Sequence, residues 1–220
     1  MDPNAGKRTL ANKLSREELQ AKLDGETFHR TTVSFYKYVI IENPQELRDA
    51  LFAKWSQWEC LGRIYVSREG INAQMNVPQH HWDAFDAFIH GLEYFHDVPF
   101  KLAVTDKTEG KSFLKLVVKV REQIVADGLQ PEDYDVTDVG AHLTAKDWNE
   151  AIEKHDPVVV DMRNHYESEI GHFEGAVLPE AETFREELPM VLEKLKGQED
   201  RKILLYCTGG IRCEKTSAYL

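Results

Sequence analysis

The residues best suited to chemistry in this sequence form one short run, Cys207-Thr208-Gly209-Gly210-Ile211-Arg212-Cys213. Two glycines allow the backbone to curl tightly, with its N–H groups pointing inward. A helix expected to start near Cys213 would direct its positive end at the same point, and Arg212 adds a positive charge. These features favour an anion at Cys207, and the thiolate is the nucleophilic form of cysteine. The run therefore predicts a reactive cysteine at position 207 rather than a buried structural one.

Further candidate residues precede this run in the same half of the chain. Asp161 and Arg163 follow an apolar stretch at 158–160, and the carboxyl ends of parallel strands share one edge of a sheet. They are expected to face the Cys207 loop, where Arg163 either binds an anionic substrate group or pairs with nearby acids. His172 is expected to stabilise a turn. Cys213 either resolves a persulfide or disulfide, or packs at the start of its helix.

The elements around these residues indicate a parallel sheet. Two fully apolar stretches, 158–160 and 203–206, are typical of strands covered on both faces. A helix before the first stretch is signalled by Thr144 with Asp147, and a helix between the two stretches by Thr183 with Glu186, the spacing of capping boxes. The sequence therefore predicts an α/β domain with a parallel sheet over residues 144–220.

The first half of the chain has a different pattern. Ser15 with Glu18 predicts a short capped helix in an N-terminal extension, residues 1–26. Extended stretches then alternate with two apolar helical stripes in the order β-α-β-β-α-β, followed by one extra strand. This order predicts a ferredoxin-like α+β domain over residues 27–121, with two helices on one face of an antiparallel sheet. The expected strands are 31–41, 63–66, 71–77, 98–104 and 113–120, and the expected helices begin at Asn43-Pro44 and near Trp82.

The other face of this predicted sheet would carry aromatic, amide and basic side chains. Such a face can stack unpaired bases and contact phosphates, so it is a candidate for RNA binding. The alternative interpretation is a solvated face with tyrosines packed at its edge, and the RNP1 motif of RNA-recognition domains does not occur. The candidate RNA-contact residues are Tyr36, Tyr38, Gln74, Lys115 and Lys119.

Charge and composition restrict the function further. The net charge of −11 argues against nucleic-acid affinity over the whole surface, and residues 122–200 carry 21 acidic but only six basic side chains. Within that region, residues 122–143 are expected to form an acidic linker. No apolar run is long enough to span a membrane, and the polar N-terminus does not resemble a signal peptide. Three cysteines, of which Cys60 is expected to be buried, fit a reducing compartment, so we expect a cytoplasmic protein.

Motifs in both halves resemble a known family. Val158 to Arg163, Gly171 to Ala176 and the Cys207 loop look like the rhodanese (sulfurtransferase) domain. Over residues 27–220, the chain resembles the bacterial rhodanese-type tRNA uridine hydroxylases. The motifs that carry this closer resemblance are Arg30 to Tyr38, Gly62 to Val66, Glu69 to Gln74, Lys111 to Phe113, Val125 to Gly128, Asp161 to Tyr166 and Tyr206 to Lys215.

The resemblance implies a specific activity. It implies oxygen-dependent 5-hydroxylation of the wobble uridine of tRNA, with Cys207 as a persulfide-forming residue and a sulfur donor as a further partner. The resemblance implies molecular oxygen as the co-substrate. The sequence contains no recognisable cofactor motif and no spacing typical of a metal site. The resemblance also implies that the family's rhodanese domain continues past the active-site helix, in which Leu220 lies, and precedes a Cys-rich tail.

Three other functions remain open from the residues. Phosphatases related to rhodaneses place five residues between the cysteine and the arginine, whereas four separate Cys207 from Arg212 here. The shorter loop suits a terminal sulfur better than a phosphate. A generic thiosulfate-type sulfurtransferase is the main alternative, but such an enzyme does not need the N-terminal module. A non-catalytic rhodanese-like RNA- or protein-binding module has little reason to keep Cys207.

Overall fold

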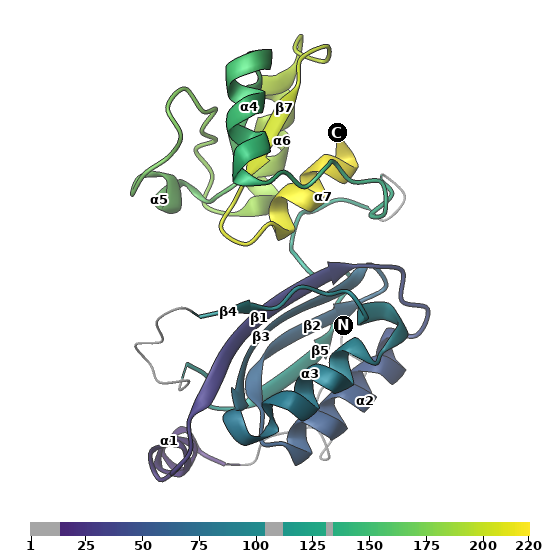
Figure 1. Ribbon diagram of the computed structural model, residues 1–220, viewed down its shortest axis with the longest axis vertical. Helices are drawn as coiled ribbons and strands as arrows, with labels where there is room; N and C mark the ends of the chain where they lie inside the picture. The colour runs from purple at the N-terminus through teal and green to yellow at the C-terminus, as the bar shows by residue number, and fades with distance from the viewer. Residues whose placement is uncertain (1–13, 104–111, 131–133) are drawn as a thin grey trace. The chain divides into compact units, whose positions relative to one another are not determined.

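The computed structural model describes residues 14–103, 112–130 and 134–220 of the chain (Figure 1). These residues separate into two compact units, with the boundary between Ile124 and Val125. Within the described ranges, no helix combines the length and the apolar composition needed to cross a lipid bilayer.

The first unit is a five-stranded sheet with the strand order β4-β1-β3-β2-β5. Figure 1 shows helices α2 and α3 on the same face of this sheet. Leu51 and Trp55 of α2, and Phe85 and Ile89 of α3, are fully buried against the strands. The elements are α1 (Arg16–Asp24), β1 (Arg30–Tyr38), α2 (Pro44–Gln57), β2 (Leu61–Ser67), β3 (Gly70–Pro78), α3 (Trp82–His90), β4 (Lys101–Leu102) and β5 (Leu116–Val120), with 3₁₀ turns η1 (Gln79–His81) and η2 (Glu93–Phe95).

Local sequence signals explain where these elements begin. Ser15 and Glu18 form the predicted capping box of α1. The Asn43 side chain accepts a hydrogen bond from the Glu46 N–H, and Pro44 occupies the first turn of α2. Gly70 begins β3 with φ of 141°, and a Cβ there would lie 1.9 Å from the carbonyl oxygen of Lys37. Only glycine fits this close approach of β3 to β1.

The ferredoxin-like prediction is confirmed, with one difference in the sheet. β1, β3, β2 and β4 pair antiparallel, but β5 runs parallel to β2, so the sheet is mixed. Within the sheet, β4 and β5 point in opposite directions. Because they lie at opposite edges of the sheet, β5 meets β2 instead of β4. The expected strand 31–41 ends early, since the Val39 and Ile41 N–H groups donate to Glu69 and Arg68 in the β2–β3 turn.

The second unit contains the predicted parallel sheet. β6 (Val158–Asp161) and β7 (Ile203–Tyr206) pair in parallel, and Val177 adds a parallel bridge to Val160. Three side chains of α6 (Phe184–Leu195) pack against β6 in the apolar core of this unit. The remaining helices are α4 (Ala145–His155), α5 (His165–Ser168) and α7 (Ile211–Tyr219).

Part of the segment expected to be an acidic linker packs within the second unit. Its Asp127 carboxylate lies 3.0 Å from the Lys215 ammonium of α7, and both side chains are fully buried. The same ammonium lies 4.0 Å from the centroid of the Tyr134 ring and donates a hydrogen bond to the Tyr134 hydroxyl. This pairing attaches the segment to the helix that follows the Cys207 loop.

Removing one partner of this buried pair should destabilise the second unit. We expect Lys215→Met to lower its free energy of unfolding by about 3–5 kcal/mol, because Asp127 would retain an uncompensated buried charge. Urea denaturation followed by far-UV circular dichroism measures the change. The double variant Lys215→Met/Asp127→Asn removes both charges and should recover most of the loss. A double variant as unstable as the single one would contradict the ion-pair explanation.

Candidate functional site

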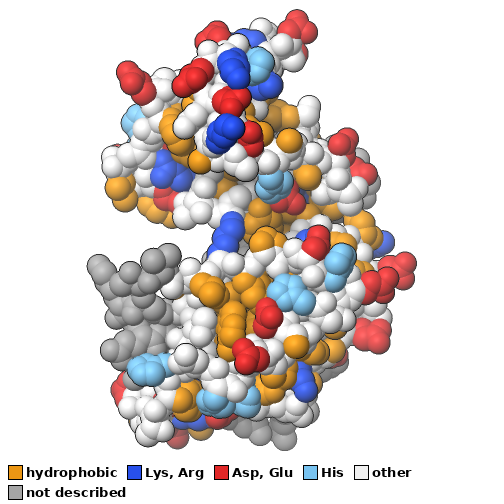
Figure 2. Space-filling view, viewed as in Figure 1, with side chains coloured by type: hydrophobic (Ala, Val, Ile, Leu, Met, Phe, Trp, Pro, Cys, Tyr) orange, Lys and Arg blue, Asp and Glu red, His pale blue; other side chains and the backbone are white. Residues whose placement is uncertain are grey.

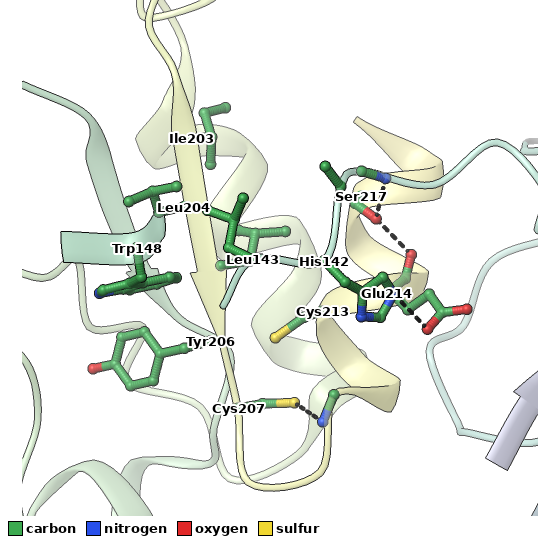
Figure 3. Close-up of a pocket in the computed structure, with 14 residues that line it drawn as sticks. His142, Leu143, Trp148, Ile203, Leu204, Tyr206, Cys207, Cys213, Glu214 and Ser217 are labelled. Carbon is green, nitrogen blue, oxygen red and sulfur yellow. Dashed lines mark hydrogen bonds and ion pairs between the residues drawn. The ribbon is translucent and has the colours of Figure 1, made fainter. Parts of the chain in front are cut away.

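The predicted cysteine loop lies at the carboxyl end of β7. Cys207 directly follows the strand, and α7 begins four residues later at Ile211. Gly210 has φ of 90°, a left-handed conformation that lets the chain turn from the strand into the helix. Its N–H group donates a hydrogen bond to the Cys207 sulfur over 3.0 Å (Figure 3). The sulfur therefore faces the N-terminal end of α7, whose partial positive charge favours an anion.

Hydrogen bonds make Cys207 an acidic thiol. The Cys213 side chain donates to its sulfur, and the N–H groups of Cys213, Gly209 and Gly210 also donate. Although burial opposes ionisation, these bonds lower the pKa of Cys207 to about 5. Cys213 has a raised pKa because its proton is shared with Cys207. Burial raises the pKa of Cys60 in the first unit to about 12, as its predicted burial implies.

Arg212 binds an acid beside the loop, and the negative charge of Cys207 also acts on it. Its guanidinium donates to both carboxylate oxygens of Glu167 in α5, at 2.9 and 3.2 Å, and to the side chain of Asn164. The Thr208 hydroxyl donates to the same carboxylate over 2.5 Å. Partial burial opposes the charge of Glu167, but these bonds lower its pKa to about 2. Arg212 and Thr208 thus brace the loop against α5, while the backbone and Cys213 stabilise the thiolate.

Asp161 and Arg163 lie at the end of β6, as predicted, and bind each other. The Arg163 guanidinium donates to both oxygens of the fully buried Asp161 carboxylate, at 2.8 and 2.7 Å, and to the carbonyl of Gly171. The Tyr206 hydroxyl also donates to Asp161 over 2.8 Å. These bonds lock the ends of β6 and β7 together, which favours the pairing interpretation of Arg163 over anion binding. The His172 ring contacts the Ser168 carbonyl at 3.0 Å, in keeping with a turn-stabilising role.

Sequence reasoning missed a buried acid in this unit, Glu187 of α6. Its side chain is fully buried, and neither carboxylate oxygen has a hydrogen-bond partner in the described part of the chain. Burial raises its pKa to about 8 against the attraction of Arg212, and the negative charges of Asp161 and Cys207 add to the rise. Glu187 therefore holds a proton at neutral pH. The sequence signal for its burial is its position three residues after Phe184, on the apolar stripe of the helix.

The candidate RNA-contact residues all lie in the first unit. Tyr36 and Gln74 project from the sheet face opposite the helices, and Lys119 lies in register with Tyr65 on that face. Lys115 directly precedes β5 and is exposed. Tyr38 is only 7% exposed, so its ring braces that of Tyr36 at 6.1 Å and offers little surface to a base.

The fold and the cysteine loop agree with two domain families. The UPF0176 acylphosphatase like domain matches residues 30–124, and the rhodanese-like domain matches residues 144–220. The two matches follow one another along the chain and fall in its first and second compact units.

Three curated relatives illustrate the similarity, and each is named tRNA uridine(34) hydroxylase. The protein of Leptospira interrogans is 56% identical over 214 residues, which cover 97% of this chain and 58% of the relative. The proteins of Photorhabdus laumondii and Erwinia tasmaniensis are 45% and 48% identical, over 96% of this chain and 60% of each relative. The chain thus spans about three fifths of the length of the relatives it matches.

The lowered pKa of Cys207 predicts selective labelling. We expect iodoacetamide to modify Cys207 first, with a rate that is half-maximal near pH 5 and constant above pH 7. Cys60 should react only after unfolding, because burial raises its pKa to about 12. Mass spectrometry of peptides labelled across a pH series measures all three cysteines, and unfolded protein is the control. Half-maximal labelling of Cys207 near the ordinary thiol value of about 8.5 would contradict the proposed hydrogen-bonded thiolate.

The buried proton of Glu187 predicts a dependence of stability on pH. The folded-state pKa of about 8 lies above the ordinary glutamate value of 4.5, so between these two pH values unfolding releases a proton. The stability of the wild type should therefore fall, relative to Glu187→Gln, as pH rises from about 5 to 8, and then the difference should stay constant. Between pH 5 and pH 8, we expect the free energy of unfolding of the wild type, relative to that of Glu187→Gln, to fall by at least about 1 kcal/mol. Urea denaturation at pH 5, 7 and 8.5 tests this, and a gap that does not change with pH would contradict a buried neutral acid.

Proposed function

We propose that this protein takes part in oxygen-dependent 5-hydroxylation of the wobble uridine of tRNA, with Cys207 as its reactive group. The observation that carries the proposal is the Cys207 sulfur at the end of β7, which accepts a hydrogen bond from the Gly210 N–H and whose pKa is lowered by its contact with Cys213. The names of the relatives support tRNA as substrate and hydroxylation as the reaction. The product is 5-hydroxyuridine.

In this proposal, Cys207 accepts a sulfur atom from a sulfur donor. Its thiolate attacks the outer sulfur of a sulfur donor, the donor's S–S bond breaks, and the remainder of the donor leaves with the electron pair. Cys207 then carries a persulfide, whose terminal anion lies where loop N–H groups converge. Hydroxylation by molecular oxygen also consumes two electrons, because the second oxygen atom leaves as water. A persulfide belongs to the class of reductants that supply such electrons.

Two alternative reactions differ in what the loop would have to bind. A phosphatase needs the loop arginine on the phosphate, but Arg212 is paired with Glu167 through two hydrogen bonds. Generic transfer of sulfur to a small acceptor such as cyanide uses the same thiolate, and it remains the second candidate. It assigns no role to the first unit, whereas a tRNA substrate requires a surface that binds RNA.

The proposal is tested by measuring wobble nucleosides in cells that lack the gene. Mass spectrometry of tRNA should show loss of 5-hydroxyuridine, and its restoration by the wild-type gene only when oxygen is supplied. Cys207→Ser should not restore the modification, whereas the matched variant Cys60→Ala should, since Cys60 lies in the core of the other unit. Full restoration by Cys207→Ser would refute the role of the thiolate. Unchanged 5-hydroxyuridine in the deletion strain would refute the function itself.

A further inference from the structure

The sheet of the first unit has one face without a helix packed on it. Val33 and Phe35 of β1 point toward α2 and α3, so the alternate side chains of each strand point to the other side. The strand register aligns these side chains in rows across the sheet. One row runs Lys101, Ser34, Gln74, Arg63, Val117, and the next runs Tyr36, Asn72, Tyr65, Lys119. We call the surface formed by these two rows the polar sheet face.

Within the two rows every charged side chain is positive, and beside them the buried Glu69 carboxylate accepts a hydrogen bond from the Ile124 N–H. Arg63 and Lys101 are exposed, and Lys119 is half-buried. Arg121, just after β5, reaches the same face, since its guanidinium lies 5.8 Å from the centroid of the Tyr65 ring. The two rows contain no aspartate or glutamate, and within the described residues Arg63, Lys119 and Arg121 have no carboxylate partner. Cations that the protein leaves unneutralised on one face are suited to a polyanion.

Two half-exposed tyrosine rings lie among these cations. The Lys101 ammonium is 5.3 Å from the centroid of the Tyr36 ring, and Arg121 has the same relation to Tyr65. The buried ring of Tyr38 packs edge-on against Tyr36 and fixes its orientation. Tyr36 and Tyr65 belong to strands separated by β3, so their backbones are roughly 10 Å apart. That separation allows bases one or two nucleotides apart in a single strand to reach both rings.

We propose that the polar sheet face binds an unpaired stretch of tRNA. Bases stack on Tyr36 and Tyr65, and phosphates contact Arg63, Lys101 and Lys119. Exposed Gln74, which lies between Lys101 and Arg63 in its row, hydrogen-bonds a base edge. Stacking requires bases whose faces are free, so the face selects a loop over a duplex. This inference rests on the proposed function for the identity of the RNA, and it assigns the binding of that substrate to the first unit.

The test compares matched double charge reversals. Arg63→Glu/Lys119→Glu alters the polar sheet face, and Lys22→Glu/Lys54→Glu makes the same change in net charge on α1 and α2, away from the two rows. Filter binding of the full protein to a tRNA anticodon stem-loop is measured at two salt concentrations. We expect the face variant to lose at least about tenfold in affinity and to show a shallower salt dependence, with little change in the control. Equal losses in the two variants would overturn the proposal in favour of a diffuse positive field.

Stacking is tested separately with Tyr65→Leu, which keeps an apolar side chain on the strand. It should weaken stem-loop binding about tenfold and leave the weaker binding of the stem duplex unchanged. Equal binding of loop and duplex by the wild type would refute base stacking. Labelling of Cys207 by iodoacetamide should be unchanged in every variant, which shows that the second unit is intact.

The outcomes also separate this inference from the proposed function. If wobble hydroxylation requires Cys207 but the face variants bind the stem-loop and restore hydroxylation normally, RNA binding by the polar sheet face is refuted and the proposed function is retained. If the deletion leaves 5-hydroxyuridine unchanged while the face variants still lose stem-loop binding, the proposed reaction is refuted and the RNA surface is retained.

Discussion

The second unit depends on keeping one negative charge in a partly buried loop. Burial disfavours the Cys207 thiolate, so its stability requires donors that are already in place when the loop folds. A helix that begins at Ile211 supplies such donors from the backbone, and Gly210 provides the turn that points them at the sulfur. The position of α7 is therefore the critical constraint. The buried contact of Lys215 with Asp127 and Tyr134 holds that helix in place.

The ionisable groups around the thiolate are balanced so that few charges remain uncompensated. Glu167 neutralises Arg212, and Arg163 neutralises Asp161. Glu187 keeps its proton, since burial and its acidic neighbours raise its pKa. Because the arginines are committed to carboxylates, any anion carried by Cys207 is stabilised mainly by fixed N–H dipoles. Such dipoles need no reorganisation when the charge moves from the thiolate to an attached sulfur.

Local patterns in the sequence predicted most of the elements and the parallel sheet of β6 and β7, but two other long-range pairings were not predicted. The capping residues Ser15, Asn43 and Thr144 each begin the helix expected of them. In β3, Ile71, Ala73 and Met75 alternate into the core, but the polar Asn76 is also fully buried. By contrast, the pairing of β5 with β2 and of Arg212 with Glu167 joins residues more than 40 positions apart. No local spacing encodes such contacts, because they arise only when separate elements pack.

The two edges of the five-stranded sheet differ in how readily they could pair with the edge of another chain. An edge strand exposes backbone groups that can pair with the edge of another chain, which is a route to aggregation. β4 pairs over only Lys101 and Leu102, so that edge presents a very short template. β5 forms the other edge, and it contains Lys119 and is followed by Arg121, so two such edges would repel each other. The same cations that suit the sheet to a nucleic acid thus also disfavour its association with a second copy of itself.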